Sequence, residues 1–251
     1  MAGHSQFKNI MHRKGAQDKK KAKLFNKLAR EITVAAKSGL PDPVVNSRLR
    51  NALASARENN MPNDRIKRAI EQANPNNAGA SNYEDIRYEG YGPGGVAVIV
   101  EALTDNRNRT AGDVRSTFAK NGGALGETNS VSFMFVKIGS IAYPLAAAGE
   151  EQLFEAAVEA GAENVEAADG IYEVTTRPAD FIAVKEALEK EFGAAQDSGI
   201  IWKPVTTVSV TQEQAKDLID LIEALEDLDD VQNVFSNFEV EQSVMDRLLA
   251  S

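Results

Sequence analysis

The sequence predicts an α+β protein in which an N-terminal three-helix domain is followed by two small α/β sandwich domains. Three observations in the 251 residues lead to this prediction. Apolar residues recur at helical spacing in the first part of the chain. A polar stretch with Pro, Gly, Asn and Ser follows at 74–82. Beyond it, short runs with the alternation of strands are interleaved with helical patterns.

The first helix is expected over 18–38. Its apolar stripe consists of Phe25, Leu28, Ile32 and Ala35. Gly39 and Pro41 follow, and this pair is typical of a helix end.

Two shorter helices should complete the first domain. The second is expected to begin at Asp42 as N-cap, with Pro43 at its first position, and to end near Asn59. The third is expected to be capped by Asn63 or Asp64 and to turn its apolar residues inward. Together the three helices predict a small bundle.

After the polar stretch, strands at 86–89 and 96–103 flank the glycine-rich segment 90–95. This segment matches the spacing G-x-G-x-x-G, but a strand follows it where a dinucleotide site requires a helix. The sequence therefore favours a hairpin with a bulge over a phosphate cradle. Thr110 with Asp113 resembles a capping box that opens the next helix, which ends at 122–123. Further strands are expected at 132–138, 141–143, near 165, and at 171–176, 199–202, 205–210 and 231–240. Further helices are expected at 149–160, 179–192 and 212–226.

Composition excludes several classes of site. Because Cys is absent, the chain has no disulfide, thiolate zinc site, iron–sulfur cluster or cysteine nucleophile. His4 and His12 have no acidic partner nearby, so we expect no metal and no cofactor. We find no signal-peptide core and no apolar run long enough to span a bilayer, so a cytoplasmic protein without a membrane partner is expected.

Charge divides the chain at the same place as the apolar pattern. The whole chain has 28 Lys and Arg against 37 Asp and Glu, a net charge of -9, which by itself argues against a nucleic-acid partner. Residues 1–77, however, hold 16 of these cations and 6 of the acids, and the rest holds 12 and 31. The average thus hides a basic domain followed by an acidic part.

The basic residues are the strongest functional signal. Neutralising phosphates with Lys and Arg releases counterions and gives salt-sensitive binding to nucleic acid. The second and third helices could also act as a helix-turn-helix. The alternatives are a solvated basic face and a helix resting on an anionic membrane. The candidates in this domain are Lys8, Arg13, Lys14, Lys19, Lys20, Lys21, Lys23, Lys27, Arg30, Arg48, Arg50, Arg57, Arg65, Lys67 and Arg68.

Two further features lie in the acidic part. Arg107 and Arg109 stand just before an expected helix, whose first N–H groups favour anions. They either bind a nucleic-acid phosphate or pair with nearby acids, and the sequence does not choose between the two. The acids at 223–230 cluster at a helix end and are expected to form a solvated surface.

Several long motifs resemble the YebC/PmpR family. They are MAGHS and HRKGAQDKKK near the start, the segment 59–70, YEGYGPGG, VEALTDNRNRT and DVRSTFAKNGG. The resemblance spans almost the whole chain. It implies a helical domain over 1–77, an α/β domain formed by 78–132 with 206–251, and a ferredoxin-like α/β domain inserted at 133–205. One departure is Asn129, where the family usually has Gly before Ser-Val; Asn also tolerates positive φ, so the turn is expected to survive.

The resemblance implies a regulator of gene expression, because members are described as DNA-binding transcriptional regulators. Others are described as translation factors that act on the ribosome at proline-rich nascent sequences, so binding to ribosomal RNA is the alternative. The resemblance extends to the matching basic residues of the tail and helices and to Arg107 and Arg109. We expect the acidic α/β domains to shape a cleft or contact a protein partner. No nucleophile or acid–base pair is evident, so we expect no enzyme; a metal-dependent nuclease is the competing class.

Overall fold

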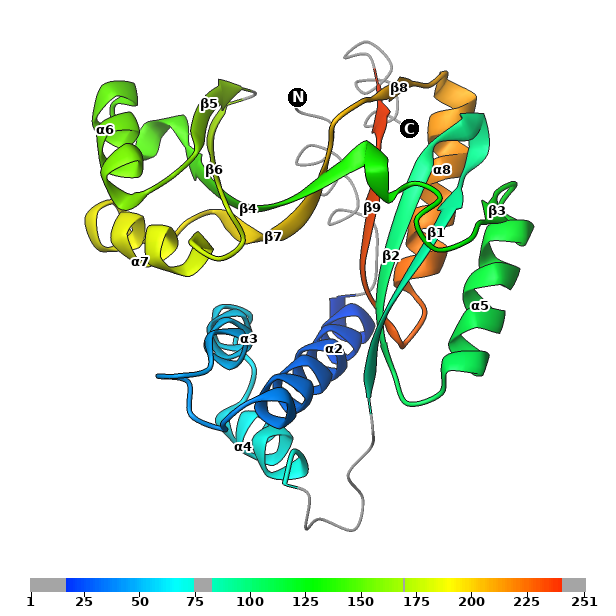
Figure 1. The fold of residues 1–251 in the computed structure, drawn as a ribbon, viewed down its shortest axis with the longest axis horizontal. Helices are drawn as coiled ribbons and strands as arrows, with labels where there is room; N and C mark the ends of the chain where they lie inside the picture. Colours follow the sequence, from blue (N-terminus) through cyan, green and yellow to red (C-terminus); the bar gives the residue numbers. More distant parts are fainter. Residues whose placement is uncertain (1–16, 75–82, 169, 241–251) are drawn as a thin grey trace.

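The computed structural model describes residues 17–74, 83–168 and 170–240 (Figure 1). The α+β class is confirmed: a three-helix domain precedes two α/β sandwiches, and the second sandwich is inserted in the first. In Figure 1 the helical domain lies at the bottom, the first α/β domain at the right and the inserted domain at the upper left.

The helical domain consists of α2 (Gln17–Ser38), α3 (Ser47–Glu58) and α4 (Asn63–Gln72). Its core contains the expected stripe of α2 packed on Leu49, Leu53 and Ile66. This core shares no cluster residue with the other domains among the described residues.

Two expected N-caps were wrong. Helix α3 begins after Asn46, whose side chain accepts a hydrogen bond from the backbone N–H of Leu49 at 3.0 Å. Asp42 instead closes the preceding turn, where its carboxylate accepts from the N–H of Val44. Asn46 is the better N-cap because its amide also donates to two carbonyls near the end of α2. One side chain therefore links both helices. Helix α4 follows Pro62 and has no side-chain cap.

The first α/β domain is built on a four-stranded sheet of order β3-β1-β2-β9, with antiparallel pairs. Helices α5 and α8 lie on one face of the sheet (Figure 1). Buried side chains of β2 and β9 pack there against Phe118 and Leu221. Its elements are β1 (Glu84–Tyr91), β2 (Ala97–Thr104), α5 (Arg107–Lys120), β3 (Ala124–Leu125), α8 (Gln212–Glu226) and β9 (Val231–Ser236).

The glycine-rich segment is the turn of the β1–β2 hairpin, as predicted. Gly94 and Gly95 both have φ near +70°, a backbone that favours glycine. The expected cap at Thr110 was wrong: helix α5 begins after Asn106, whose side chain accepts from the N–H of Arg109. Thr110 lies one turn further on, and its buried hydroxyl contacts Asp230 instead.

The inserted domain has a second antiparallel sheet of order β5-β6-β4-β7 with helices α6 and α7. This succession and strand order are those of a split βαβ, ferredoxin-like fold. The elements are β4 (Phe135–Pro144), α6 (Glu150–Ala160), β5 (Asn164–Ala168), β6 (Ile171–Thr176), α7 (Phe181–Phe192) and β7 (Asp197–Pro204).

The expected break between two strands at 139–140 was wrong, since β4 runs through it. Gly139 is there for packing rather than for a turn, because a Cβ on it would lie 2.4 Å from Oγ1 of Thr176. The strand expected at 205–210 is reduced to β8 (Val208–Ser209), which pairs in parallel with β10 (Phe238–Glu239).

The insertion follows from the sheets themselves. Strands β1, β2 and β3 precede the inserted domain in the chain, whereas β9 follows it and pairs with β2. Where the two α/β domains meet, Ile99, Phe135 and Phe235 form an apolar cluster with Trp202 packed against it. This cluster makes the junction between the α/β domains partly hydrophobic.

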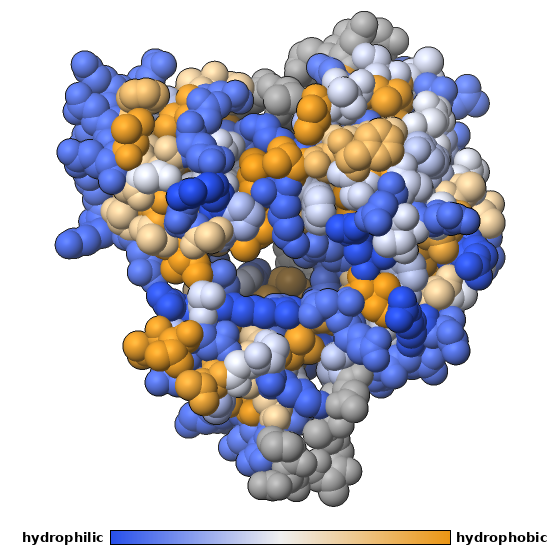
Figure 2. All heavy atoms as spheres, viewed as in Figure 1, coloured by the Kyte–Doolittle hydropathy of each residue, from blue (hydrophilic) through white to orange (hydrophobic). Residues whose placement is uncertain are grey.

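The helical domain is held to the rest of the protein by polar contacts. Helix α2 meets the turn between α8 and β9, and α3 meets α7 through an ion pair of Glu58 with Lys185 at 3.0 Å. The space-filling view is hollowed between the helical and inserted domains (Figure 2). No helix in the described part of the chain is long and apolar enough to cross a membrane.

Candidate nucleic-acid interface

The structure separates the predicted basic residues into three groups. Lys8, Arg13 and Lys14 lie outside the described residues, and of Lys19 and Lys20 only the helical backbone is described. Of the others, some are engaged in ion pairs and some are exposed without a partner. This division decides which cations are available to a ligand.

One face of α2 is engaged with residues 226–230, the acidic turn between α8 and β9. Nζ of Lys23 lies 2.8 Å from the carboxylate of Asp227, and Lys27 donates to the carbonyl of Glu226 at 2.9 Å. Burial lowers the pKa of Lys27, an effect that the charge of Glu226 partly offsets. The carbonyls here are at the C-terminus of α8, the negative end of its dipole, so cations are favoured at this place.

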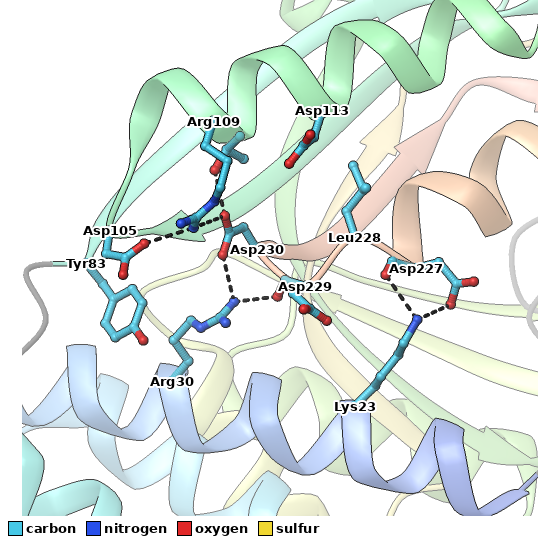
Figure 3. Close-up of a pocket in the computed structure, with 11 residues that line it drawn as sticks. Lys23, Arg30, Tyr83, Asp105, Arg109, Asp113, Asp227, Leu228, Asp229 and Asp230 are labelled. Carbon is cyan, nitrogen blue, oxygen red and sulfur yellow. Dashed lines mark hydrogen bonds and ion pairs between the residues drawn. The ribbon is translucent and has the colours of Figure 1, made fainter.

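Asp230 is the centre of the contact (Figure 3). It is 7% exposed, and its carboxylate accepts from Arg109 and Thr110, each at 2.7 Å. Arg30 reaches its other oxygen at 3.2 Å and donates to the carbonyl of Asp229. Burial alone would raise the pKa of Asp230, but the bonds from Arg109 and Thr110 outweigh it, and the pKa is lowered.

The acidic turn is therefore not the solvated surface expected from its sequence. Asp230 is buried, and the turn binds side chains from α2 and α5. Sequence reasoning missed this because the partners are far apart along the chain. The only local signal was the apolar Leu228 and Val231 that flank the acids, since a wholly solvated turn would not need them.

Arg48 and Arg50 also have structural partners. The guanidinium of Arg48 forms bonds of 2.7–3.1 Å with Glu31 and Asp85, and these bonds raise its pKa. Arg50 donates to two carbonyls of the turn between α2 and α3. Both arginines therefore stabilise the positions of helices rather than present a free charge.

The remaining cations are presented to solvent. Within the described residues, the exposed side chains of Arg57, Lys67, Arg68 and Arg107 have no hydrogen-bond or ion-pair partner. Lys21 is also exposed and lies 5.8 Å from the centre of the Phe25 ring. These side chains can take an anionic ligand without breaking an existing ion pair.

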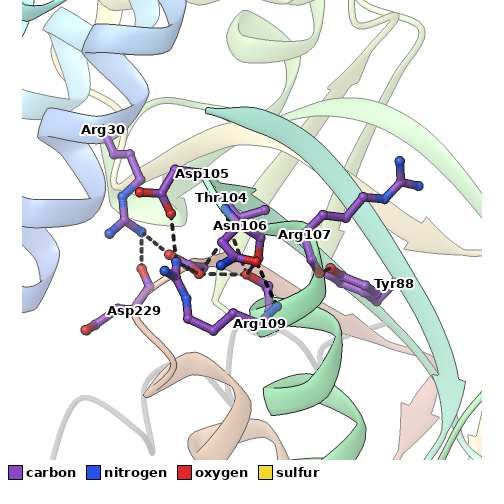
Figure 4. Close-up of polar contacts among 10 residues, drawn as sticks. Arg30, Tyr88, Thr104, Asp105, Asn106, Arg107, Arg109 and Asp229 are labelled. Atoms are coloured by element: carbon purple, nitrogen blue, oxygen red, sulfur yellow. Dashed lines mark hydrogen bonds and ion pairs between the residues drawn. The ribbon is translucent and has the colours of Figure 1, made fainter. Parts of the chain in front are cut away.

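The two arginines before α5 behave differently. Arg109 turns back to bind Asp105 and Asp230, at 2.9 and 2.7 Å, which corresponds to the ion-pair alternative. Arg107 points away from this cluster (Figure 4) and is exposed. Only Arg107 of the pair is free to contact a phosphate in this conformation.

A cavity of about 740 Å³ opens between α2 and the first α/β domain (Figure 3). Its lining carries three cations, Lys23, Arg30 and Arg109. It also carries five carboxylates, Asp105, Asp113, Asp227, Asp229 and Asp230. The excess of negative charge makes this cavity unfavourable for a phosphate.

Helices α3 and α4 are joined by a four-residue turn, 59–62, of the length used in helix-turn-helix motifs. The exposed side of α4 carries Lys67 and Arg68 together with Asp64 and Glu71. A helix of this kind can lie against a phosphate backbone, while its acids limit how many phosphates it can contact.

Two observations bear on the metal-dependent alternative. Within the described ranges, no group of three or more His, Asp or Glu is placed to hold a metal ion. Asp105 and Asp230 both bind Arg109. Asp230 also accepts a hydrogen bond from Thr110, so its oxygens already have partners within the protein.

Two family models match the chain. The one described as "TACO1/YebC protein N-terminal domain" matches residues 5–76, and the one described as "TACO1/YebC second and third domain" matches residues 83–238. The gap between the matches coincides with the change of charge along the chain. A crystal structure of a conserved hypothetical protein from Aquifex aeolicus is similar, with 45% sequence identity and a TM-score of 0.79. The similarity covers 88% of this chain and 91% of that one.

Proposed function

Because this chain belongs to the TACO1/YebC family, we propose that it is a nucleic-acid-binding regulator of gene expression, and in the first place a DNA-binding transcriptional regulator. The family model for the two α/β domains is named for transcriptional regulation. The protein binds nucleic acid through its helical domain and acts without catalysis.

The observation that carries this proposal is the pair of unpartnered cations on α4. Lys67 and Arg68 are exposed on the helix that would be the second of a helix-turn-helix. The basic N-terminal segment precedes the same domain and adds charge. Such an arrangement binds phosphates strongly at low salt and needs no contact with a base.

A ribosomal RNA target is the second candidate, and one observation favours it. Arg57, Arg68 and Arg107 are free but come from α3, α4 and α5, in two different domains. Structured RNA is recognised by shape and by phosphates that are spread over an irregular surface. Cations distributed over two domains suit such a surface as well as a straight duplex.

The experiment is a binding titration with duplex DNA, ribosomal RNA hairpins and intact ribosomes over a range of salt. For the double variant Lys67→Gln/Arg68→Gln, the slope of log K against log salt should fall by about 0.9 for each lost contact with duplex DNA. The matched control is Lys190→Gln/Lys216→Gln, which removes two exposed charges from the α/β domains.

The outcomes separate the candidates. Promoter-selective binding to DNA supports a transcriptional regulator, and binding to ribosomes alone supports a translation factor. If the two double variants changed the salt dependence of binding equally, only net charge would matter. The helix α4 would then not be part of the interface. Metal-dependent cleavage of either nucleic acid, lost on substitution of named carboxylates, would replace the proposal by a nuclease.

A further inference from the structure

A second, smaller hollow is lined mainly by the helical domain, with Tyr83 beside it. This groove of about 300 Å³ lies between α2 and α4. Ala29 and Ala69 line it, and Oγ1 of Thr33 donates to the carbonyl of Ala69 at 2.9 Å where the helices meet. Small side chains at the crossing leave room for a ligand of the size of a phosphate group.

The walls of the groove are cationic. Arg30, Arg65 and Arg68 line it, and its described lining contains no carboxylate. The larger cavity on the other side shares Arg30 and Tyr83 with the groove but carries five Asp side chains. Two neighbouring hollows therefore have opposite charge, and an anion is attracted to the smaller one.

The arginines are held in place but still have donors to offer. Arg65 donates one hydrogen bond, at 2.9 Å, to Oδ1 of Asn26, and its guanidinium lies 5.5 Å from the Phe25 ring centre. Arg30 lies 5.3 Å from the ring centre of Tyr83, and only its Nη1 is bound to Asp229 and Asp230. A guanidinium has five N–H donors, so Arg65 keeps four beyond its bond to Asn26.

We propose that this groove is a subsite for one phosphodiester group of the nucleic-acid backbone. Arg68 closes on the phosphate from α4, and Arg65, already oriented by Asn26, supplies a planar pair of donors. The inference rests on the proposed function and adds the place where the backbone is held. It also predicts that the backbone avoids the acidic 740 Å³ cavity.

The test uses the isosteric substitution Asn26→Asp in the full chain. The new carboxylate keeps an acceptor for Arg65 but places a negative charge at the groove. The matched control is Asn63→Asp, which adds the same charge to an exposed position of the same domain that does not line the groove. Both variants are titrated with fluorescent duplex DNA and ribosomal RNA hairpins, and their melting temperatures are compared.

Asn26→Asp should weaken binding about 10-fold or more, the effect of losing a charge-assisted contact, while the fold is retained. Asn63→Asp should weaken it by less than about 3-fold through general repulsion. If both variants weakened binding equally while the wild-type protein bound normally, the groove would not be a phosphate subsite, and the proposed function would be unaffected. If wild-type protein bound neither nucleic acid, both the proposed function and the proposed phosphate subsite would be contradicted.

Discussion

Arg30 and Asp230 join the helical domain to the first α/β domain, with Nη1 of Arg30 3.2 Å from the carboxylate. The same carboxylate is bound by Arg109 from α5, so one buried acid receives two cations from two domains. A carboxylate in this position is stable only while its donors remain, because an unpaired buried charge is costly.

Substitution of Asp230 should destabilise the protein. We expect Asp230→Asn to lower the free energy of unfolding by about 3 kcal/mol, because Arg30 and Arg109 lose their charged partner. Urea denaturation at neutral pH measures the effect. Asp229→Asn is the matched control, because the exposed Asp229 contacts Arg30 through its backbone carbonyl. If the two variants were equally stable, the side chain of Asp230 would have no special role.

Stability should fall in acid because of two carboxylates. Burial tends to raise the pKa of Glu89, but the N–H groups of Val131 and Ser132 donate to it at 2.9 and 2.8 Å, and its pKa is lowered. The pKa of Asp230 is also lowered, there by the bonds from Arg109 and Thr110, which outweigh burial. A lowered pKa in the folded state stabilises the protein fully above the unfolded pKa of about 4, and this stabilisation is lost as the pH falls through the folded value.

The variant Glu89→Gln tests this pH dependence. Its unfolding free energy should be lower than that of wild type by about 2 kcal/mol near pH 7, since hydrogen bonds to a charged acceptor are replaced by weaker ones. The difference should shrink as the pH falls below about 4, because Glu89 is protonated first in the unfolded chain, and it should vanish as the pH falls through the lowered pKa of the folded state. Thermal or urea melts from neutral to acid pH measure it. A constant difference over this range would contradict the prediction.

Asn129 occupies a backbone conformation that favours glycine. Its φ is +68°, and its side-chain oxygen accepts from Arg87 at 2.8 Å. The expectation that Asn keeps this turn is confirmed. Asn129→Ala should lower the unfolding free energy by about 1 to 2 kcal/mol, because it loses the hydrogen bond and keeps the backbone cost of a left-handed residue. Asn129→Gly is the control and should recover most of the loss. Identical melts for the two variants would contradict this reasoning.

The elements were largely predictable because their signals are local. Helical spacing placed α2 to within a residue, and the capping pattern of Thr211 and Gln214 lies where α8 begins. Errors arose where a local signal competed with a distant partner. Thr110 looks like a cap, but its hydroxyl is used by Asp230, and no sequence window contains both residues.

The candidate interface was predictable in its composition but not in its geometry. Clustering of charge identified the basic domain, yet it did not distinguish the unpartnered Arg68 from Lys27, which is bound to the end of α8. That distinction depends on how the domains dock. Docking brings cations of the basic N-terminal domain next to acids of the α/β domains. Opposite charges that are far apart in the sequence therefore form ion pairs.

The polar attachment of the helical domain should make its position sensitive to salt. Its contacts with the other domains include the ion pairs Lys23–Asp227, Arg48–Asp85 and Glu58–Lys185, at 2.8 to 3.0 Å. Pairs with at least one exposed side chain contribute little each and are screened as the Debye length falls, whereas the more buried pair Arg30–Asp230 is screened less. The apolar clusters lie within or between the α/β domains or within the helical domain. They therefore do not oppose separation of the helical domain from the α/β domains.

We expect the radius of gyration from small-angle X-ray scattering to increase between about 0.05 and 0.5 M NaCl, over which screening becomes strong. Circular dichroism should stay unchanged, because each domain keeps its own core. The variant Asp227→Asn, which releases Lys23, should reach the expanded state at lower salt. Lys216→Gln changes an exposed charge away from this contact and should follow the wild type. A radius independent of salt in all three proteins would mean that the helical domain is held by more than its ion pairs.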